Sequence, residues 1–115
     1  MIKRIESGPR MSQAVVHGNT VYIAGQVAGD PTADVSGQTR QILGRIDALL
    51  AAAGTDKARL LSATIYLSDI STFAAMNYVW DAWVVPGSTP ARATVEAALA
   101  APEYRVEIVV IAALP

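Results

Sequence analysis

Residues 34–54 read Asp-Val-Ser-Gly-Gln-Thr-Arg-Gln-Ile-Leu-Gly-Arg-Ile-Asp-Ala-Leu-Leu-Ala-Ala-Ala-Gly, and this stretch decides the fold. Asp34 is a suitable N-cap, and Gly54 suits the left-handed position that ends many helices. Between them the apolar residues recur at helical spacing, at Val35, Ile42, Leu43, Ile46, Leu49, Leu50 and Ala53. The stretch therefore predicts an amphipathic helix with one apolar side to bury.

The segments around this helix predict strands and a second helix. Gly18-Asn19 separates two apolar and β-branched runs, residues 13–17 and 20–24, as in a tight hairpin. Three later runs also have the composition of strands: residues 60–67, 91–98 and 105–112. Ser68-Asp69 can cap a second helix that ends before Pro86-Gly87 and has a stripe of Phe73, Met76, Asn77, Trp80 and Val84. The predicted order is β-β-α-β-α-β-β in a single domain, residues 1–115.

Two helices cannot cover both faces of a sheet of about five or six strands, so we expect both on one face. The composition suggests what happens to the other face, because 52% of the residues are hydrophobic and only 17% are charged. We expect further copies of the chain to cover it in a dimer or trimer, with ligand clefts between the subunits.

Charge and cysteine content narrow the classes of function. Nine basic and ten acidic residues give a net charge of −1, and no basic stripe suggests a nucleic-acid partner. Cysteine is absent, which excludes disulfides, a thiolate nucleophile and Cys-ligated metal sites. Neither a Gly-rich phosphate loop nor a His/Asp metal spacing is present, so we expect no metal and no cofactor. The first residues lack the apolar stretch of a signal peptide, and no run approaches the roughly 18 residues that cross a bilayer, so we expect a cytoplasmic protein without a membrane partner.

A lone arginine begins a strand-like segment near the C-terminus, in the run Ser88-Thr89-Pro90-Ala91-Arg92-Ala93-Thr94-Val95-Glu96. A guanidinium that enters an apolar sheet must be paired or must face a cleft, because its uncompensated burial is costly. Its planar fork suits a carboxylate. The residues alone leave two hypotheses: Arg92 forms a structural ion pair with Glu96 or Glu107, or it binds the carboxylate of a ligand.

Eight motifs follow one another along nearly the whole chain: Ser12-Gln13-Ala14-Val15, Gly18-Asn19, Ala24-Gly25-Gln26, Gln38 with Gln41, Ala53-Gly54, Phe73 with Met76-Asn77, Pro90-Ala91-Arg92-Ala93-Thr94-Val95-Glu96 and Val106-Glu107-Ile108. In this order they resemble the RidA/YjgF family of reactive-intermediate deaminases. The resemblance implies a chorismate-mutase-like α+β protomer with two helices on one sheet face, and a homotrimer with a central barrel and clefts between neighbouring subunits. It also implies hydrolysis of 2-imino or 2-enamino acids, of the 2-iminobutanoate and 2-iminopropanoate type, to 2-oxo acids and ammonia.

The resemblance also implies roles for particular residues. Arg92, in the Pro-Ala-Arg motif, would hold the substrate carboxylate, and Glu107 would act with the attacking water. Ala24 and Gly25 would offer backbone groups to the substrate. Considered without the resemblance, Glu107 has an alternative partner in Arg105, on the same strand face.

The N-terminal segment departs from the family pattern. Relatives usually have Gly-Pro-Tyr-Ser-Gln, whereas this chain has Gly8-Pro9-Arg10-Met11-Ser12-Gln13. Met11 therefore stands where the family has a tyrosine that lines the site, and we expect Met11 to contact the substrate. Arg10 is either solvated or a second positive group there.

Other polar and aromatic residues are expected to have structural roles. We expect His17 to be exposed beside its turn, and Ser12 has no base partner that would make it a nucleophile. Asn77 should be hydrogen-bonded to a backbone loop. The aromatic residues of the second helix are expected in the core or in an interface, and these are Phe73, Trp80 and Trp83.

Three functions are therefore to be weighed. An imine deaminase requires Arg92 to be free to meet a ligand carboxylate. A non-enzymatic, small-molecule-binding or chaperone-like trimer would use the same clefts without turnover. A ribonuclease, a label sometimes attached to the family, is disfavoured by the acidic balance and the absence of clustered basic residues.

Overall fold

Helix α1, Val35–Ala53, forms where the sequence predicts it in this computed structural model, which describes residues 1–115. Both predicted caps are present. Asp34 Oδ1 accepts a 2.8 Å hydrogen bond from the backbone N–H of Gly37. Gly54 has a φ of 90°, a left-handed conformation that glycine adopts without strain. The helix buries its apolar side against the sheet.

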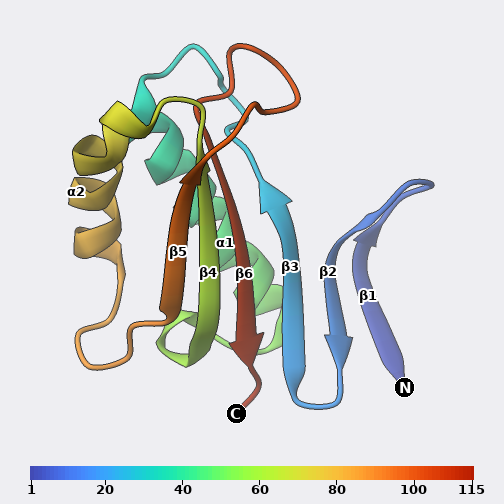
Figure 1. Ribbon diagram of the computed structural model, residues 1–115. Helices are drawn as coiled ribbons and strands as arrows, with labels where there is room; N and C mark the ends of the chain where they lie inside the picture. Colours follow the sequence, from blue (N-terminus) through green and yellow to red (C-terminus); the bar gives the residue numbers. More distant parts are fainter.

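Six strands form one mixed sheet in the order β1-β2-β3-β6-β4-β5 (Figure 1). Their bounds are β1 Ile2–Ser7, β2 Ser12–His17, β3 Thr20–Gln26, β4 Leu60–Leu67, β5 Ala91–Glu96 and β6 Val106–Ala113. All neighbouring strands are antiparallel except β4 and β5, which are parallel. A parallel pair needs a crossover connection, and helix α2, Phe73–Trp83, supplies it.

β1 is not among the strands expected from the sequence, and some element boundaries differ from the expected ones. Charged residues interrupt the apolar residues of β1, which is an exposed edge strand paired only with β2. Asp69 caps a short 3-10 turn, Ile70–Thr72, by accepting a hydrogen bond from the backbone N–H of Ser71, and α2 begins only after this turn. A second short 3-10 turn, Lys57–Arg59, leads into β4.

Both helices lie on the same face of the sheet (Figure 1), as the sequence predicts. In β6, every second residue from Val106 to Ala112 is buried beneath the helices. The residues between them point to the other side of the sheet and are only half-buried. We call this other side the open face. Strand register places these side chains on it: Tyr22, Tyr66, Val95, Glu107, Val109 and Ile111. The open face is mostly apolar and no element of the chain covers it.

The stripe of α2 differs in part from the predicted one. Met76, Val79, Trp80 and Trp83 are its buried residues. Phe73 is 40% exposed, and Val84 lies after the end of the helix. Neither α1 nor α2 combines the length and the hydropathy that a bilayer-spanning segment needs.

A buried glutamine joins the first turn of α1 to the loop that precedes β6. Gln38 is fully buried. Its Nε2 donates to the carbonyl oxygens of Pro31, Ala33 and Glu103 at 3.0 to 3.1 Å. Its Oε1 accepts from the backbone N–H of Arg105 at 3.0 Å. The amide thus satisfies backbone groups that would otherwise be buried without partners.

We expect Gln38→Leu to lower the free energy of unfolding by about 3 kcal/mol, because it leaves a donor and several acceptors unpaired in the interior. Urea unfolding followed by circular dichroism at one fixed chain concentration measures this loss. Gln41→Leu is the matched control, because Gln41 is only half-buried and its hydrogen bonds with the backbone of Asp30 are exposed to solvent. Equal losses in the two variants would contradict the role of Gln38.

Candidate functional site

Glu107 lies on the open face near the start of β6. Its strand neighbours Val106 and Ile108 are both fully buried beneath the helices, so alternation directs the Glu107 side chain the opposite way. It pairs in register with Tyr66 of β4. No ion pair or hydrogen bond joins it to Arg105, which is exposed, so this alternative partner is not supported.

The Glu107 carboxylate packs directly against Gly25. A Cβ built at Gly25 would lie 2.9 Å from Cδ of Glu107 and closer still to Oε2. Only a residue without a side chain allows the carboxylate to occupy this position. Two of the predicted site residues, Gly25 and Glu107, are therefore neighbours.

A buried glutamine fixes the end of β3 that carries Gly25. The pairing of β3 with β6 shifts register between Ile23 and Gln26. Gln26 is 3% exposed, and its Nε2 donates to Gln13 Oε1 and to the Ala24 carbonyl, both at 2.9 Å. Its Oε1 accepts from Nε of Arg45 at 3.2 Å. The carbonyl of Ala24, whose backbone groups were expected to meet the substrate, thus already accepts a hydrogen bond from Gln26.

Met11 and Gly25 line one open groove of about 380 Å³. Gln13, Gln26 and Arg45 also border it. Met11 is 46% exposed there, in the position that the resemblance assigns to a site wall. Arg45 is not predicted from the sequence, because nothing in its helical position indicates a contact with Gln26 of another element.

Arg92 lies on the helix-covered face, not on the open face. It pairs in register with Ala63, which is buried beneath the helices. Its guanidinium carbon lies 5.7 Å from the ring centre of Phe73 and 5.4 Å from that of Trp80. Such cation–π contacts hold the head group without neutralising its charge.

The guanidinium of Arg92 has no acidic partner within the chain. Glu96, one predicted partner, instead accepts a 3.0 Å hydrogen bond from the backbone N–H of Ile70. Glu107, the other, lies on the opposite face of the sheet. The hypothesis of a structural ion pair inside one chain is therefore wrong.

Two buried polar atoms near Arg92 also lack partners. They are Oδ1 of Asn77 and Oγ1 of Thr94. Asn77 lies on α2 between Phe73 and Trp80 on one helix face, and Thr94 follows Arg92 on the same face of β5. The Asn77 side chain makes no hydrogen bond within the chain, so the prediction that it ties the helix to a backbone loop is wrong. Nothing in the sequence around Thr94 would have selected it as a site residue.

One chain does not bring Arg92 and Glu107 together. Ala63 pairs with Arg92 on one side and with Val110 on the other, so Arg92 and Val110 lie at the same height in the sheet. Val110 is three residues after Glu107, which separates Arg92 from Glu107 by about 10 Å along the strand direction. The two side chains also project from opposite faces. The candidate site residues thus fall into two separate groups, which we call half-sites, one around Gly25 and Glu107 and one around Arg92.

The remaining titratable residues add little to either half-site. His17 is exposed beside its turn, as predicted. Hydrogen bonds from the side chain and backbone of Thr32 lower the pKa of Asp30, and those of Ser71 lower the pKa of Asp69 in the same way. Both carboxylates lie in exposed turns. No three His, Asp or Glu side chains gather in a way that could hold a metal ion.

Comparison with known proteins gives consistent matches over most or all of the chain. The family model described as endoribonuclease L-PSP matches residues 1–114. A RutC family protein, YoaB of Escherichia coli K12, is 48% identical over 113 residues, which cover 98% of each chain. A crystal structure of a YjgF family member from Neisseria meningitidis is 45% identical with a TM-score of 0.98, and the match covers 100% of this chain and 96% of that one. A goat protein named 2-iminobutanoate/2-iminopropanoate deaminase is 38% identical over 107 residues, which cover 88% of this chain and 77% of the goat protein.

Proposed function

Because the chain belongs to the RidA/YjgF family, with its chorismate-mutase-like α+β fold, we propose that it is an imine deaminase. Its substrates are 2-imino and 2-enamino acids, which it hydrolyses to 2-oxo acids and ammonia. The name of the goat relative supports this reaction class.

The observation that carries the proposal is the free guanidinium of Arg92. It is half-buried and held over two aromatic rings, yet it has no carboxylate partner. An arginine in such a place gains most from a planar anion that can accept two parallel hydrogen bonds. The carboxylate of a 2-imino acid has this geometry. Asn77 and Thr94 offer further hydrogen-bonding atoms beside it.

Glu107 supplies the second requirement of the reaction, a group that positions water. A protonated 2-imino acid is already electrophilic at its C=N carbon, so a bound water can add there while Glu107 accepts its proton. The proton then passes to the nitrogen. As the C–N bond breaks and its electron pair leaves with ammonia, the hydroxyl oxygen forms the C=O bond, and its proton is passed through Glu107 to the ammonia. Overall, one iminium and one water give one 2-oxo acid and one ammonium ion.

The two half-sites lie on opposite faces of one chain, so we infer that a complete site needs a second copy. β5 is an edge strand, which leaves Arg92 near the border of the protomer. A second copy of the chain, packed on the open face, would bring its own side chains close to this edge. We propose a homotrimer in which Arg92 of one chain and Glu107 of another share each cleft, since closed rings are a common way to bury such a face.

The direct test is turnover of a freshly generated imine. We expect the purified protein to release ammonia and 2-oxo acid from an oxidase-generated 2-imino acid above the uncatalysed rate. We expect the same rate after exhaustive chelation. Saturable binding of the 2-oxo acid without turnover would favour the non-enzymatic binding protein instead. Loss of turnover on chelation, restored by one metal, would contradict the cofactor-free mechanism.

The contact between Gly25 and Glu107 predicts a selective loss of activity. Gly25→Ala forces the flexible carboxylate of Glu107 to move, so we expect kcat/KM to fall by about 10-fold to 100-fold with little change in the melting temperature. Gly44→Ala is the matched control, because a Cβ at Gly44 meets nothing within 4 Å and Gly44 lies on α1 outside both half-sites. Unchanged turnover in Gly25→Ala would mean that the position of the Glu107 carboxylate does not matter for the reaction.

A further inference from the structure

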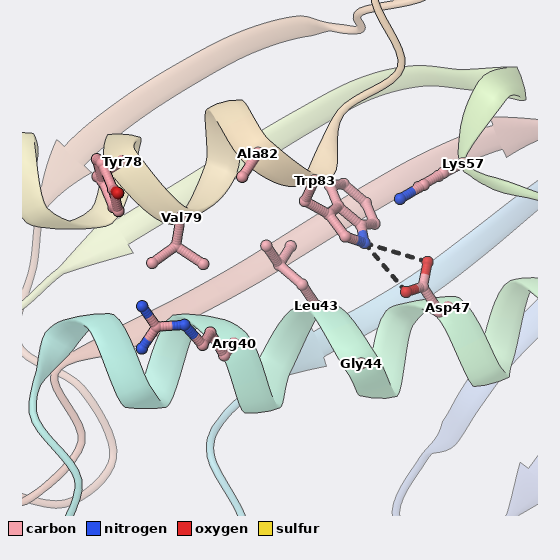
Figure 2. A pocket seen from close by; sticks show the side chains of 9 residues that line it. All are labelled: Arg40, Leu43, Gly44, Asp47, Lys57, Tyr78, Val79, Ala82 and Trp83. Carbon is pink, nitrogen blue, oxygen red and sulfur yellow. Dashed lines mark hydrogen bonds between the residues drawn. The ribbon is translucent and has the colours of Figure 1, made fainter.

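A second groove lies between α1 and α2 and shares no residue with either half-site (Figure 2). Its volume of about 340 Å³ is at the lower end of the range of small-molecule sites. Leu43 of α1 and Val79, Ala82 and Trp83 of α2 give it apolar walls. The imine chemistry proposed above gives this groove no role.

A glycine in α1 opens the floor of the groove. Arg40, Gly44 and Asp47 follow one another along one side of α1, with the glycine between the two charged residues (Figure 2). A Cβ at Gly44 would meet nothing within 4 Å, so the space above it is empty. Glycine inside a helix lowers its stability, yet no contact here requires the absence of a side chain.

The charges in the groove leave an unmatched cation at one end. The indole N–H of Trp83 donates to both carboxylate oxygens of Asp47 at 3.1 Å. The ammonium of Lys57 lies 5.3 Å from the ring centre of Trp83, at the same end of the groove. The exposed Arg40 lies at the other end (Figure 2), and Asp47, the one acidic residue that lines the groove, is bonded to Trp83 instead. With two cations and one carboxylate, the groove suits an anionic ligand.

We propose that this groove is a second binding site, for a small monocarboxylate with an apolar body. The carboxylate pairs with Arg40, and the apolar body lies over Gly44 between Leu43 and Val79, toward Trp83. Arg40 and Asp47 are seven residues apart on α1, which corresponds to about 10 Å along the helix axis. A phenyl ring on a two-carbon chain fits this length, so 3-phenylpropionate is a suitable probe.

The test is titration of the ¹⁵N-labelled protein with 3-phenylpropionate, followed by the indole N–H resonance of Trp83, which Trp83→Phe assigns. We expect a saturable shift of this resonance. Arg40→Gln should weaken binding about tenfold, because it removes a charge-assisted contact. Arg59→Gln, which removes an exposed charge close to Lys57 but outside the groove, should keep the affinity within about twofold.

Side chains introduced at Gly44 fill the groove and test the proposal independently of Arg40. Gly44→Leu should abolish the shift, and Gly44→Ala, which favours the helix, should weaken binding without destabilising the protein. Ala52→Leu, at an exposed position of α1 outside the groove, is the control for the added side chain. Arg92→Ala should leave the shift unchanged. No saturation by about 10 mM, or a shift that persists in Gly44→Leu and disappears in Arg92→Ala, would overturn the proposal.

Discussion

Replacement of Arg92 by alanine is expected to lower kcat/KM for imine hydrolysis by about 100-fold or more while the assembly stays folded. The guanidinium makes no ion pair within the chain, so its removal leaves no carboxylate stranded there. What is lost is charge-assisted binding of the substrate, about 3 kcal/mol. Arg92→Lys should recover only part of the activity, because a point charge does not reproduce the planar fork.

Turnover and thermal melting of one preparation of Arg92→Ala separate the functional role from a structural one. Arg59→Ala serves as the control, since this arginine is exposed in a short turn away from both half-sites. A large fall in melting temperature, with activity in proportion to the remaining folded protein, would defeat the assignment of Arg92 to substrate binding.

Ile111→Asp is expected to dissociate the assembly into single chains. Ile111 lies on the open face opposite Tyr22, on the apolar surface that we infer to be covered by a second copy. The free-energy cost of burying an unpaired carboxylate in this interface would exceed the free energy that the subunit contact contributes. Light scattering should give three times the chain mass of 12.1 kDa for the natural sequence and the mass of one chain for the variant.

Ile70→Asp makes the same chemical change at a residue that is 44% exposed and belongs to the turn before α2. We expect this control to keep the mass of the assembly. A single-chain mass for the natural sequence at micromolar concentration would contradict both the trimer and the shared site.

The sequence predicts α1 well because its signals are local. Asp34, the apolar period and Gly54 each act within one or two turns, and all three are present in the structure. β1 is missed because Lys3, Arg4 and Glu6 hide its pattern, and an edge strand needs no buried side. The predicted start of α2 is too early, because Asp69 caps the 3-10 turn Ile70–Thr72 and not the helix itself. Its carboxylate accepts a backbone N–H there, as it would at the start of an α-helix.

The site is predicted residue by residue but not in its arrangement. The motifs select Gly25, Glu107 and Arg92, and the first two are neighbours. That Arg92 lies on the other face depends on the register between β4 and β5, which sequence periodicity alone does not determine. The contact of Arg45 with Gln26 depends on how α1 packs beside β3, so it too has no local signal.

The separation of Arg92 and Glu107 on two faces of one sheet has a consequence for the rate law. If every centre takes its arginine and its glutamate from different chains, an isolated chain has no complete centre at all. Specific activity would then depend on protein concentration and fall on dilution, steeply once the assembly dissociates. Arg92→Ala and Glu107→Gln chains, each strongly impaired alone, would regain part of the activity on subunit exchange, since some mixed clefts receive both natural residues.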